Sequence, residues 1–239
     1  MVFKYRGRDV AVIAHRGGGM LFPENTISAF KGVQKLGVDA VECDVQLTMD
    51  GKLAVMHDPN LKRMAGIDKR ISEVTSDDIK KIILLNNEKI PMLEELIEDV
   101  DTRLIIELKS IETINPIFKI IYEQREILKR CTFISFYHEA LLILKQRFPE
   151  ADCAALIAGF PVDPVSMVHN CGCNMISMNY EGISKNYVDK CHAGGIKVSV
   201  WTPNDEKSIL SSLDAGVDAI ASDRPDLVIR LINDHGKIQ

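Results

Sequence analysis

The stretch VECDVQLTMDGKLAVMHD, residues 41–58, decides the fold, because it indicates two short strands joined by a tight turn. Asp50-Gly51 is a strong signal for a two-residue hairpin turn, in which both central residues favour a positive φ. A turn this short cannot form a parallel crossover, which takes roughly a dozen residues or more. We therefore expect residues 52–57 to return antiparallel to 42–47, outside any parallel set of strands.

The two predicted strands bring acidic and imidazole side chains together. Side chains alternate between the faces of a strand, so Glu42 and Asp44 point the same way. If Met49 pairs with Lys52, Asp44 lies opposite His57, about 5 Å away. Neighbouring carboxylates repel unless a cation or a proton lies between them, and a hard divalent metal satisfies such oxygen ligands. The alternative is an amphipathic hairpin with its polar face in water. Against it stand the apolar neighbours Val41, Val45, Leu47, Leu53 and Val55.

Eight apolar segments have the pattern of parallel strands that are each followed by a helix or a helical excursion. They are residues 10–15, 42–47, 103–109, 132–136, 153–157, 174–178, 197–202 and 219–222. Eight such units in roughly 250 residues fit a closed barrel. The alternative, an open doubly wound sheet, lacks its glycine motif, because Gly17-Gly18-Gly19 has a different spacing. We therefore predict an α/β fold, the TIM (β/α)8 barrel.

Residues 59–100 do not alternate like a strand and indicate a loop and helix excursion before the next barrel strand. TSDDIKKIILL has a helical pattern, with Thr75 or Ser76 as its N-cap. In PMLEELIEDV, Pro91 stands where a helix can start, since the first turn does not need its missing N–H. We expect a single catalytic barrel domain over residues 1–239, with this segment as a small insertion.

Composition limits the classes of function. The chain has 239 residues and a net charge of −5, which disfavours nucleic acid as a partner. No run approaches the roughly 18 apolar residues of a membrane span, and MVFKYRGRDVAVIAH lacks a signal-peptide layout. The six cysteines are scattered, as core or loop thiols in a reducing compartment would be. We therefore expect a cytoplasmic protein with a small-molecule substrate and no stable membrane insertion, and the oligomeric state stays open.

Polar residues gather at the C-terminal ends of the predicted strands, where barrel active sites lie. The strand ends and the hairpin supply His15, Arg16, Glu42, Asp44, His57, Asp58, Glu107, Lys109, Trp201 and Asp223. Singly, each has a structural interpretation: Glu107 and Lys109 could pair within a barrel layer, and Trp201 could be core. Their coincidence at one rim is harder to explain by packing, because buried charges are costly unless they are paired or bound to metal.

The charged members of this set suit a phosphate ester. Glu42, Asp44 and Glu107 come from adjacent strands and can share one divalent cation. Arg16 and Lys109 can hold non-bridging phosphate oxygens, and arginine can do so through two hydrogen bonds.

Two histidines and an aromatic residue complete the predicted site. His15 and His57 can move protons at neutral pH. Trp201 stands at the end of its strand, immediately before Thr202-Pro203. We expect it to line the pocket as an apolar wall for a glycerol backbone or for a quaternary ammonium group.

The chain resembles the glycerophosphodiester phosphodiesterase family in the order and spacing of its motifs. These are HRG, PENT with AF, VECDVQLTMDGKLAVMHD, IPMLEEL, IIELK, ISF, VWTPN and GVDAIASDRPD. The match runs from about His15 to Asp226, nearly the whole chain. It implies a barrel of the phospholipase-C-like type with a small insertion after the HD motif. It also implies one divalent cation, Mg²⁺ or Ca²⁺ with Mn²⁺ as a third candidate, and hydrolysis of glycerophosphodiesters to glycerol 3-phosphate and an alcohol.

The resemblance assigns roles by motif position. The family's catalytic histidines correspond to His15 and His57, and its metal carboxylates to Glu42, Asp44 and Glu107. Its phosphate-contacting cations correspond to Arg16 and Lys109. Its ENT motif, which supports these groups from behind, corresponds to Glu24 and Asn25. The sequence departs from the family pattern in the glycine-rich, apolar loop HRGGGMLFPENT, at Tyr137, and at Asn179 and Tyr180. These departures leave the alcohol half of the substrate open.

We expect a metal-dependent phosphodiesterase acting on small glycerophosphodiesters, with His15 as the base and His57 as the acid toward the leaving alcohol. The reverse assignment stays open, as do direct attack by water and attack by the glycerol 2-hydroxyl to give a cyclic phosphate. A lysophospholipase D could use Met20, Leu21 and Phe22 as an apolar lip, but no basic amphipathic helix marks a membrane-surface protein. A non-catalytic binding barrel should have lost at least one of the two histidines or three acids, and all five are present.

Overall fold

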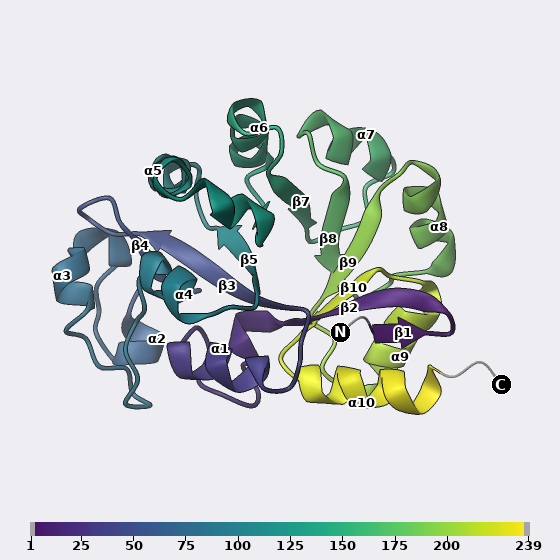
Figure 1. Ribbon diagram of the computed structural model, residues 1–239, viewed down its shortest axis with the longest axis horizontal. Helices are drawn as coiled ribbons and strands as arrows, with labels where there is room; N and C mark the ends of the chain where they lie inside the picture. The colour runs from purple at the N-terminus through teal and green to yellow at the C-terminus, as the bar shows by residue number, and fades with distance from the viewer. Residues whose placement is uncertain (1–2, 237–239) are drawn as a thin grey trace.

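The computed structural model describes residues 3–236 and confirms the closed (β/α)8 barrel (Figure 1). Its eight parallel strands are β2 (Arg8–Ala14), β3 (Ala40–Leu47), β5 (Arg103–Leu108), β6 (Cys131–Ser135), β7 (Asp152–Ile157), β8 (Met175–Asn179), β9 (Lys197–Trp201) and β10 (Ala219–Ser222). The ring closes because β10 pairs with β2, which also pairs with β3. One strand was not predicted: β1 (Phe3–Tyr5) pairs antiparallel with the beginning of β2.

Helices lie around the outside of the barrel (Figure 1). They are α1 (Ile27–Gln34), α4 (Leu93–Asp99), α5 (Ile114–Glu123), α6 (His138–Arg147), α7 (Pro164–Asn170), α8 (Lys185–Ala193), α9 (Glu206–Ala215) and α10 (Pro225–His235), with 3-10 turns at η1 (His15–Gly17), η3 (Ile111–Thr113) and η4 (Arg125–Lys129). Their apolar faces pack on the outward side chains of the strands and form the main core.

The alternation of side chains along β3 and β5 places the acidic residues inside the barrel. On β5, Leu104, Ile106 and Leu108 point outward into the main core, whereas Ile105 and Glu107 face the interior cavity. On β3 the odd-numbered residues are likewise in the outer core, which leaves the even-numbered acids inside. The predicted sharing of one face is therefore confirmed.

The hairpin forms as predicted, but its register differs by one residue. β4 (Leu53–Val55) runs antiparallel to β3, with Leu47 opposite Leu53 and Val45 opposite Val55. The backbone N–H of Met56 donates to the Asp44 carbonyl at 2.9 Å. The predicted pairing of Asp44 with His57 is therefore wrong.

The reason for the shifted register is a turn with three residues in place of two. Thr48 pairs with Lys52, and its N–H donates to the Lys52 carbonyl at 2.9 Å. The Thr48 hydroxyl donates to the Asp50 carboxylate at 2.7 Å and accepts from the Lys52 N–H at 2.9 Å. Asp50 also accepts from the backbone N–H and hydroxyl of Ser76, which lies far along the chain. Gly51 takes the left-handed φ of +76° that this turn requires.

The segment between β4 and β5 forms a small apolar core together with Ala54 of β4. Its members are Ala54, Met56, Leu61, Ile71, Val74, Ile79, Leu84, Ile90 and Met92. It contains α2 (Lys62–Ala65), η2 (Ile71–Glu73) and α3 (Ser76–Ile79) before α4 begins. Thr75 caps α3 as predicted, but this helix is a single turn. Of the apolar residues that follow, Ile82 and Leu84 pack in the small core, whereas Ile83 and Leu85 are exposed, so they do not form one helical stripe. The helix predicted to start at Pro91 begins two residues later, with Met92 as the N-cap and Leu93 as the first residue of α4.

Candidate active site

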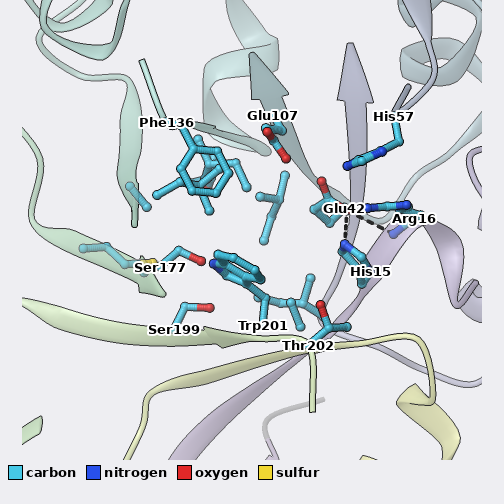
Figure 2. Close-up of a pocket in the computed structure, with 18 of the residues that line it drawn as sticks. His15, Arg16, Glu42, His57, Glu107, Phe136, Ser177, Ser199, Trp201 and Thr202 are labelled. Carbon is cyan, nitrogen blue, oxygen red and sulfur yellow. Dashed lines mark hydrogen bonds and ion pairs between the residues drawn. The ribbon is translucent and has the colours of Figure 1, made fainter. Parts of the chain in front are cut away.

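A cavity of about 310 Å³ lies at the C-terminal ends of the barrel strands (Figure 2). Its charged side is formed by His15, Arg16, Glu42, His57, Glu107 and Lys109, which follow or belong to β2, β3, β4 and β5. Its apolar side is formed by Ile134, Leu156, Met175 and Trp201 from β6 to β9. The cavity can therefore hold a molecule with one anionic and one less polar half.

The three predicted metal carboxylates converge beside this cavity. Glu42, Asp44 and Glu107 are all buried, and one oxygen from each lies within 4.8 Å of the others. The cause is the parallel register, which sets Asp44 next to Glu107 across β3 and β5. Burial, together with the negative charge of Asp44, raises the pKa of Glu42. Burial also raises the pKa of Glu107. The triad therefore holds more negative charge than its surroundings neutralise, and it fits a divalent cation.

Lys109 and Arg16 are the fixed cations of the triad. The Lys109 ammonium lies 2.7 Å from Asp44 Oδ1 and 2.8 Å from Glu107 Oε1. Arg16 Nε lies 3.5 Å from Asp44 Oδ2, and the Arg16 backbone N–H donates to Glu42 Oε2 at 3.0 Å. Burial alone would raise the pKa of Asp44, but these two cations hold it below its ordinary value. Both cations also border the cavity.

The loop with the ENT motif supports the triad from behind. Asn25 donates from Nδ2 to Asp44 Oδ2 at 2.7 Å, and its own backbone takes a φ of +57°. Glu24 Oε1 lies 3.4 Å from Arg16 Nη1. Neither Glu24 nor Asn25 lines the cavity. The two residues therefore contact groups of the predicted site without meeting its contents.

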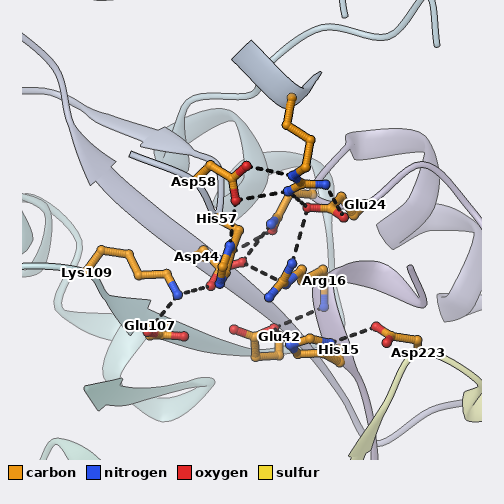
Figure 3. A network of polar contacts seen from close by, with 12 residues as sticks. His15, Arg16, Glu24, Glu42, Asp44, His57, Asp58, Glu107, Lys109 and Asp223 are labelled. Carbon is orange, nitrogen blue, oxygen red and sulfur yellow. Dashed lines mark hydrogen bonds and ion pairs between the residues drawn. The ribbon is translucent and has the colours of Figure 1, made fainter. Parts of the chain in front are cut away.

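Both predicted catalytic histidines are held through Nδ1 by an aspartate, and both line the cavity (Figure 3). His15 Nδ1 lies 2.7 Å from Asp223 Oδ1, and His57 Nδ1 lies 2.8 Å from Asp58 Oδ1. In each case Nε2 is left for a second partner; that of His15 is 4.0 Å from Glu42 Oε2. With Nδ1–H as the donor, each ring can exchange a proton from Nε2.

The two imidazoles have opposite pKa shifts. Burial opposes the charged form of His15, but the hydrogen bond to Asp223 and the charge of Glu42 raise its pKa. Burial lowers the pKa of His57, against the attraction of Asp44. The site therefore favours the protonated form of His15 and the neutral form of His57.

Trp201 lines the cavity at the end of β9, as the sequence predicted. Its ring packs edge-on against Phe136, with ring centroids 5.9 Å apart. The buried Nε1 has no hydrogen-bond partner among residues 3–236, and both Trp201 and Ser177 line the cavity (Figure 2). An aromatic wall with one free donor suits a polyol better than a purely apolar group.

A second, more open groove of about 770 Å³ adjoins the cavity. It shares His57, Glu107, Lys109 and Phe136 with the cavity. Its other walls come from the insertion, through Pro59, Arg70 and Ser72, and from the segments after β5 and β6, through Ser110, Glu112 and Tyr137. His57 therefore borders both spaces.

The predicted apolar lip is smaller than expected. Met20 and Leu21 are exposed, but Phe22 is partly buried against the main core and so does not belong to a lip. None of the three lines the cavity. No helix among residues 3–236 is long and apolar enough to cross a membrane.

Two contacts of this site were missed in the sequence. Asp223 was predicted at the rim, but its bond to His15 joins residues from opposite ends of the chain. Arg63, in the insertion, binds both Asp58 and Glu24 and was not predicted at all. No spacing rule within one sequence connects Arg63 with Glu24, because the contact joins the insertion to the loop before α1.

Comparison with known proteins shows what the chain resembles. The family described as the glycerophosphoryl diester phosphodiesterase family matches residues 15–227. A glycerophosphodiester phosphodiesterase of Caldanaerobacter subterraneus subsp. tengcongensis is 33% identical over 94% of this chain and 98% of its own length. One from Bacillus altitudinis is 32% identical over 92% and 97%. A phosphodiesterase of Oleispira antarctica, solved in complex with the product sn-glycerol-3-phosphate, is 28% identical with a TM-score of 0.87, over 93% of this chain and 96% of that one.

Proposed function

The chain belongs to the glycerophosphoryl diester phosphodiesterase family, and on that premise we propose how its residues hydrolyse glycerophosphodiesters to glycerol 3-phosphate and an alcohol. The observation that carries the proposal is the convergence of three buried carboxylate oxygens within 4.8 Å of one another, beside a cavity that both histidines line. The test is release of glycerol 3-phosphate from choline, ethanolamine, serine and glycerol diesters by metal-loaded protein. No release from any of them would refute the proposal.

The proposed metal site consists of Glu42, Asp44 and Glu107, which would hold one divalent cation, Mg²⁺ or Ca²⁺, with Mn²⁺ as a third candidate. Three oxygen donors with an excess of negative charge match hard cations of this kind. When bound, the cation would neutralise charge that develops on the phosphate and offset the carboxylate charge around His15.

Arg16 and Lys109 are the proposed phosphate-binding residues. Both border the cavity, and both are already held close to Asp44 by ion pairs. Because these contacts fix the two cations before substrate binds, little side-chain entropy is lost on binding. Glu24 and Asn25 keep Arg16 and Asp44 in place from behind.

His15 and His57 are the proposed proton-transfer groups, with His15 as the base and His57 as the acid toward the leaving alcohol. The support for this assignment is position, since His57 borders both the cavity and the groove whereas His15 borders the cavity only. Asp223 and Asp58 hold the two rings, so that Nε2 is the exchanging nitrogen of each. The raised pKa of His15 and the lowered pKa of His57 favour the reverse assignment, and a leaving-group experiment decides between the two.

The two spaces beside His57 suggest where each arm of the diester lies. We place the glycerol arm in the enclosed cavity, where Trp201 Nε1 and Ser177 offer hydrogen bonds. The alcohol arm then lies in the groove, which is open enough to admit groups of different size. Of the two roles foreseen for Trp201, the wall for glycerol is therefore the one that we propose.

Trp201→Ala is expected to raise KM roughly 5- to 30-fold for choline and glycerol diesters alike, because about 1–2 kcal/mol of apolar contact with glycerol is lost. KM for bis(p-nitrophenyl) phosphate, which has no glycerol, should stay unchanged. Trp201→Phe is the matched control and should recover most of the affinity. A rise confined to choline diesters would move Trp201 to the alcohol arm, and a lower Tm with unchanged KM would make it a packing residue.

Two further proposals concern the domain organisation of the enzyme and its cellular location. We treat residues 1–239 as one catalytic barrel domain in which residues 59–100, approximately, form an insertion that contributes to the groove. We place the enzyme in the cytoplasm, since the six cysteines are all free and buried.

A further inference from the structure

Arg63, at the second position of α2 in the insertion, holds two carboxylates at once. Its Nε donates to Asp58 Oδ2 at 2.6 Å and its Nη2 to Asp58 Oδ1 at 3.1 Å. Its Nη1 donates to Glu24 Oε2 at 3.1 Å and its Nη2 also to Glu24 Oε1 at 2.6 Å. Each carboxylate is therefore bound through both oxygens by one planar group, a geometry that only arginine provides.

The two carboxylates each contact a different residue of the proposed site: Asp58 contacts His57, and Glu24 contacts Arg16. Asp58 Oδ1, which accepts from Arg63, also lies 2.8 Å from His57 Nδ1. Glu24 Oε1 also lies 3.4 Å from Arg16 Nη1 (Figure 3). Arg63 itself does not line the cavity or the groove. Its effect on the site must therefore pass through Asp58 and Glu24.

We propose that Arg63 is a positioning residue, which fixes the Asp58 carboxylate so that His57 presents Nε2 to the substrate. This inference rests on the proposed function. The alternative is a surface ion pair that only ties the insertion to the loop before α1. The Arg63 side chain is 46% exposed, and an exposed pair contributes little to stability. The two interpretations therefore predict different effects of an Arg63 substitution on the orientation of His57, but similar small effects on the stability of the fold.

The chemistry of Asp58 explains why an arginine is needed there. The hydrogen bond to Arg63 is the main reason why the pKa of Asp58 is held at about 2. Asp58 is thus a carboxylate at any working pH and accepts the Nδ1–H of His57. A carboxylate can rotate about its last bond unless both oxygens are held. Without Arg63, Asp58 keeps its charge but loses the orientation that aims the imidazole.

The kinetic test compares two substrates. Arg63→Ala should lower kcat for glycerophosphocholine about 10- to 100-fold, the usual loss when a group behind the reacting residues is removed. The same loss is then measured on a p-nitrophenyl phosphodiester. If Arg63→Ala and His57→Ala both lose more activity on one substrate than on the other, they should favour the same substrate, whatever role His57 proves to have. Arg63→Lys should recover only part of kcat, since an ammonium cannot bind both oxygens of two carboxylates. Lys62→Ala removes a neighbouring exposed cation of α2 and is the matched control.

The spectroscopic test observes the imidazole directly. In protein labelled with ¹⁵N-histidine, Arg63→Ala should shift or broaden the ring signals of His57 and leave those of His15, held by Asp223, unchanged. If Arg63→Ala does not fold, Arg63→Lys is measured in the same two ways. Unchanged His57 signals, or equal losses on two substrates that His57→Ala distinguishes, would overturn the inference. Wild-type protein that releases no glycerol 3-phosphate would instead refute the proposed function.

Discussion

His57→Ala is expected to lose about 10²- to 10⁴-fold of kcat on natural glycerophosphodiesters and to keep most of its turnover of a p-nitrophenyl phosphodiester. A natural diester releases an alkoxide, which needs a proton as it leaves, whereas p-nitrophenolate leaves readily without one. His57 is the imidazole that stands between the cavity and the groove proposed for the alcohol. The measurement is kcat for both substrates at one pH with saturating metal.

His15→Ala should behave differently, because it removes the proposed base. Activity should fall on both substrates alike, since the nucleophile must lose its proton whichever group leaves. His169→Ala, an exposed histidine at the end of α7, is the matched control and should leave both rates unchanged. If His15→Ala is the variant rescued by the good leaving group, the two roles are reversed. If neither variant separates the substrates, the histidines bind or orient and transfer no proton.

Excess chelator is expected to abolish turnover, and Mg²⁺, Ca²⁺ or Mn²⁺ to restore it. The reason is the buried triad of Glu42, Asp44 and Glu107, whose negative charge exceeds that of the two cations beside it. Metal that binds only the folded state should also raise Tm, and this readout does not depend on activity. The measurements are glycerol 3-phosphate release and thermal unfolding, each with chelator and after adding back one metal at a time.

Substitution of one proposed metal ligand distinguishes specific binding of the cation from nonspecific screening of the carboxylate charges. Glu107→Gln should lose both the activity and the increase in Tm on addition of metal, while the metal-free protein stays folded. Glu123→Gln, on the exposed side of α5, is the matched control and should keep both. Full activity in excess chelator, with no metal in the purified protein, would rule out the proposed centre.

The insertion forms part of the groove and also makes hydrogen bonds to two segments beside the proposed site. Its core is separate from the main core, yet Arg63 and Ser76 reach from it to the loop before α1 and to the hairpin turn. Destabilising this small core should therefore disturb His57 before it unfolds the barrel. The geometry of the proposed site depends in this way on a segment that contributes none of its proposed catalytic residues.

The sequence by itself determined the barrel and the acidic half of the site. Eight apolar segments set the number of parallel strands, and alternation along a strand placed Glu42 and Asp44 on one face. Glu107 was predicted beside them because adjacent parallel strands end together, and the structure pairs it with Asp44. These features follow from periodicity within single strands, which depends on local backbone geometry and therefore survives in any correct fold.

Only the tertiary structure decided how the histidines are held. The three-residue turn, whose Asp50 accepts hydrogen bonds from Ser76 of the insertion, shifts the register, so His57 is not opposite Asp44. The His57 ring is held instead by the neighbouring Asp58. His15 meets Asp223 because β10 closes on β2, far away in the sequence. The hydrogen bonds of Ser76 with Asp50 and of His15 with Asp223 join segments that are distant in the sequence. No periodicity within one segment records them, because their geometry exists only after the chain has closed.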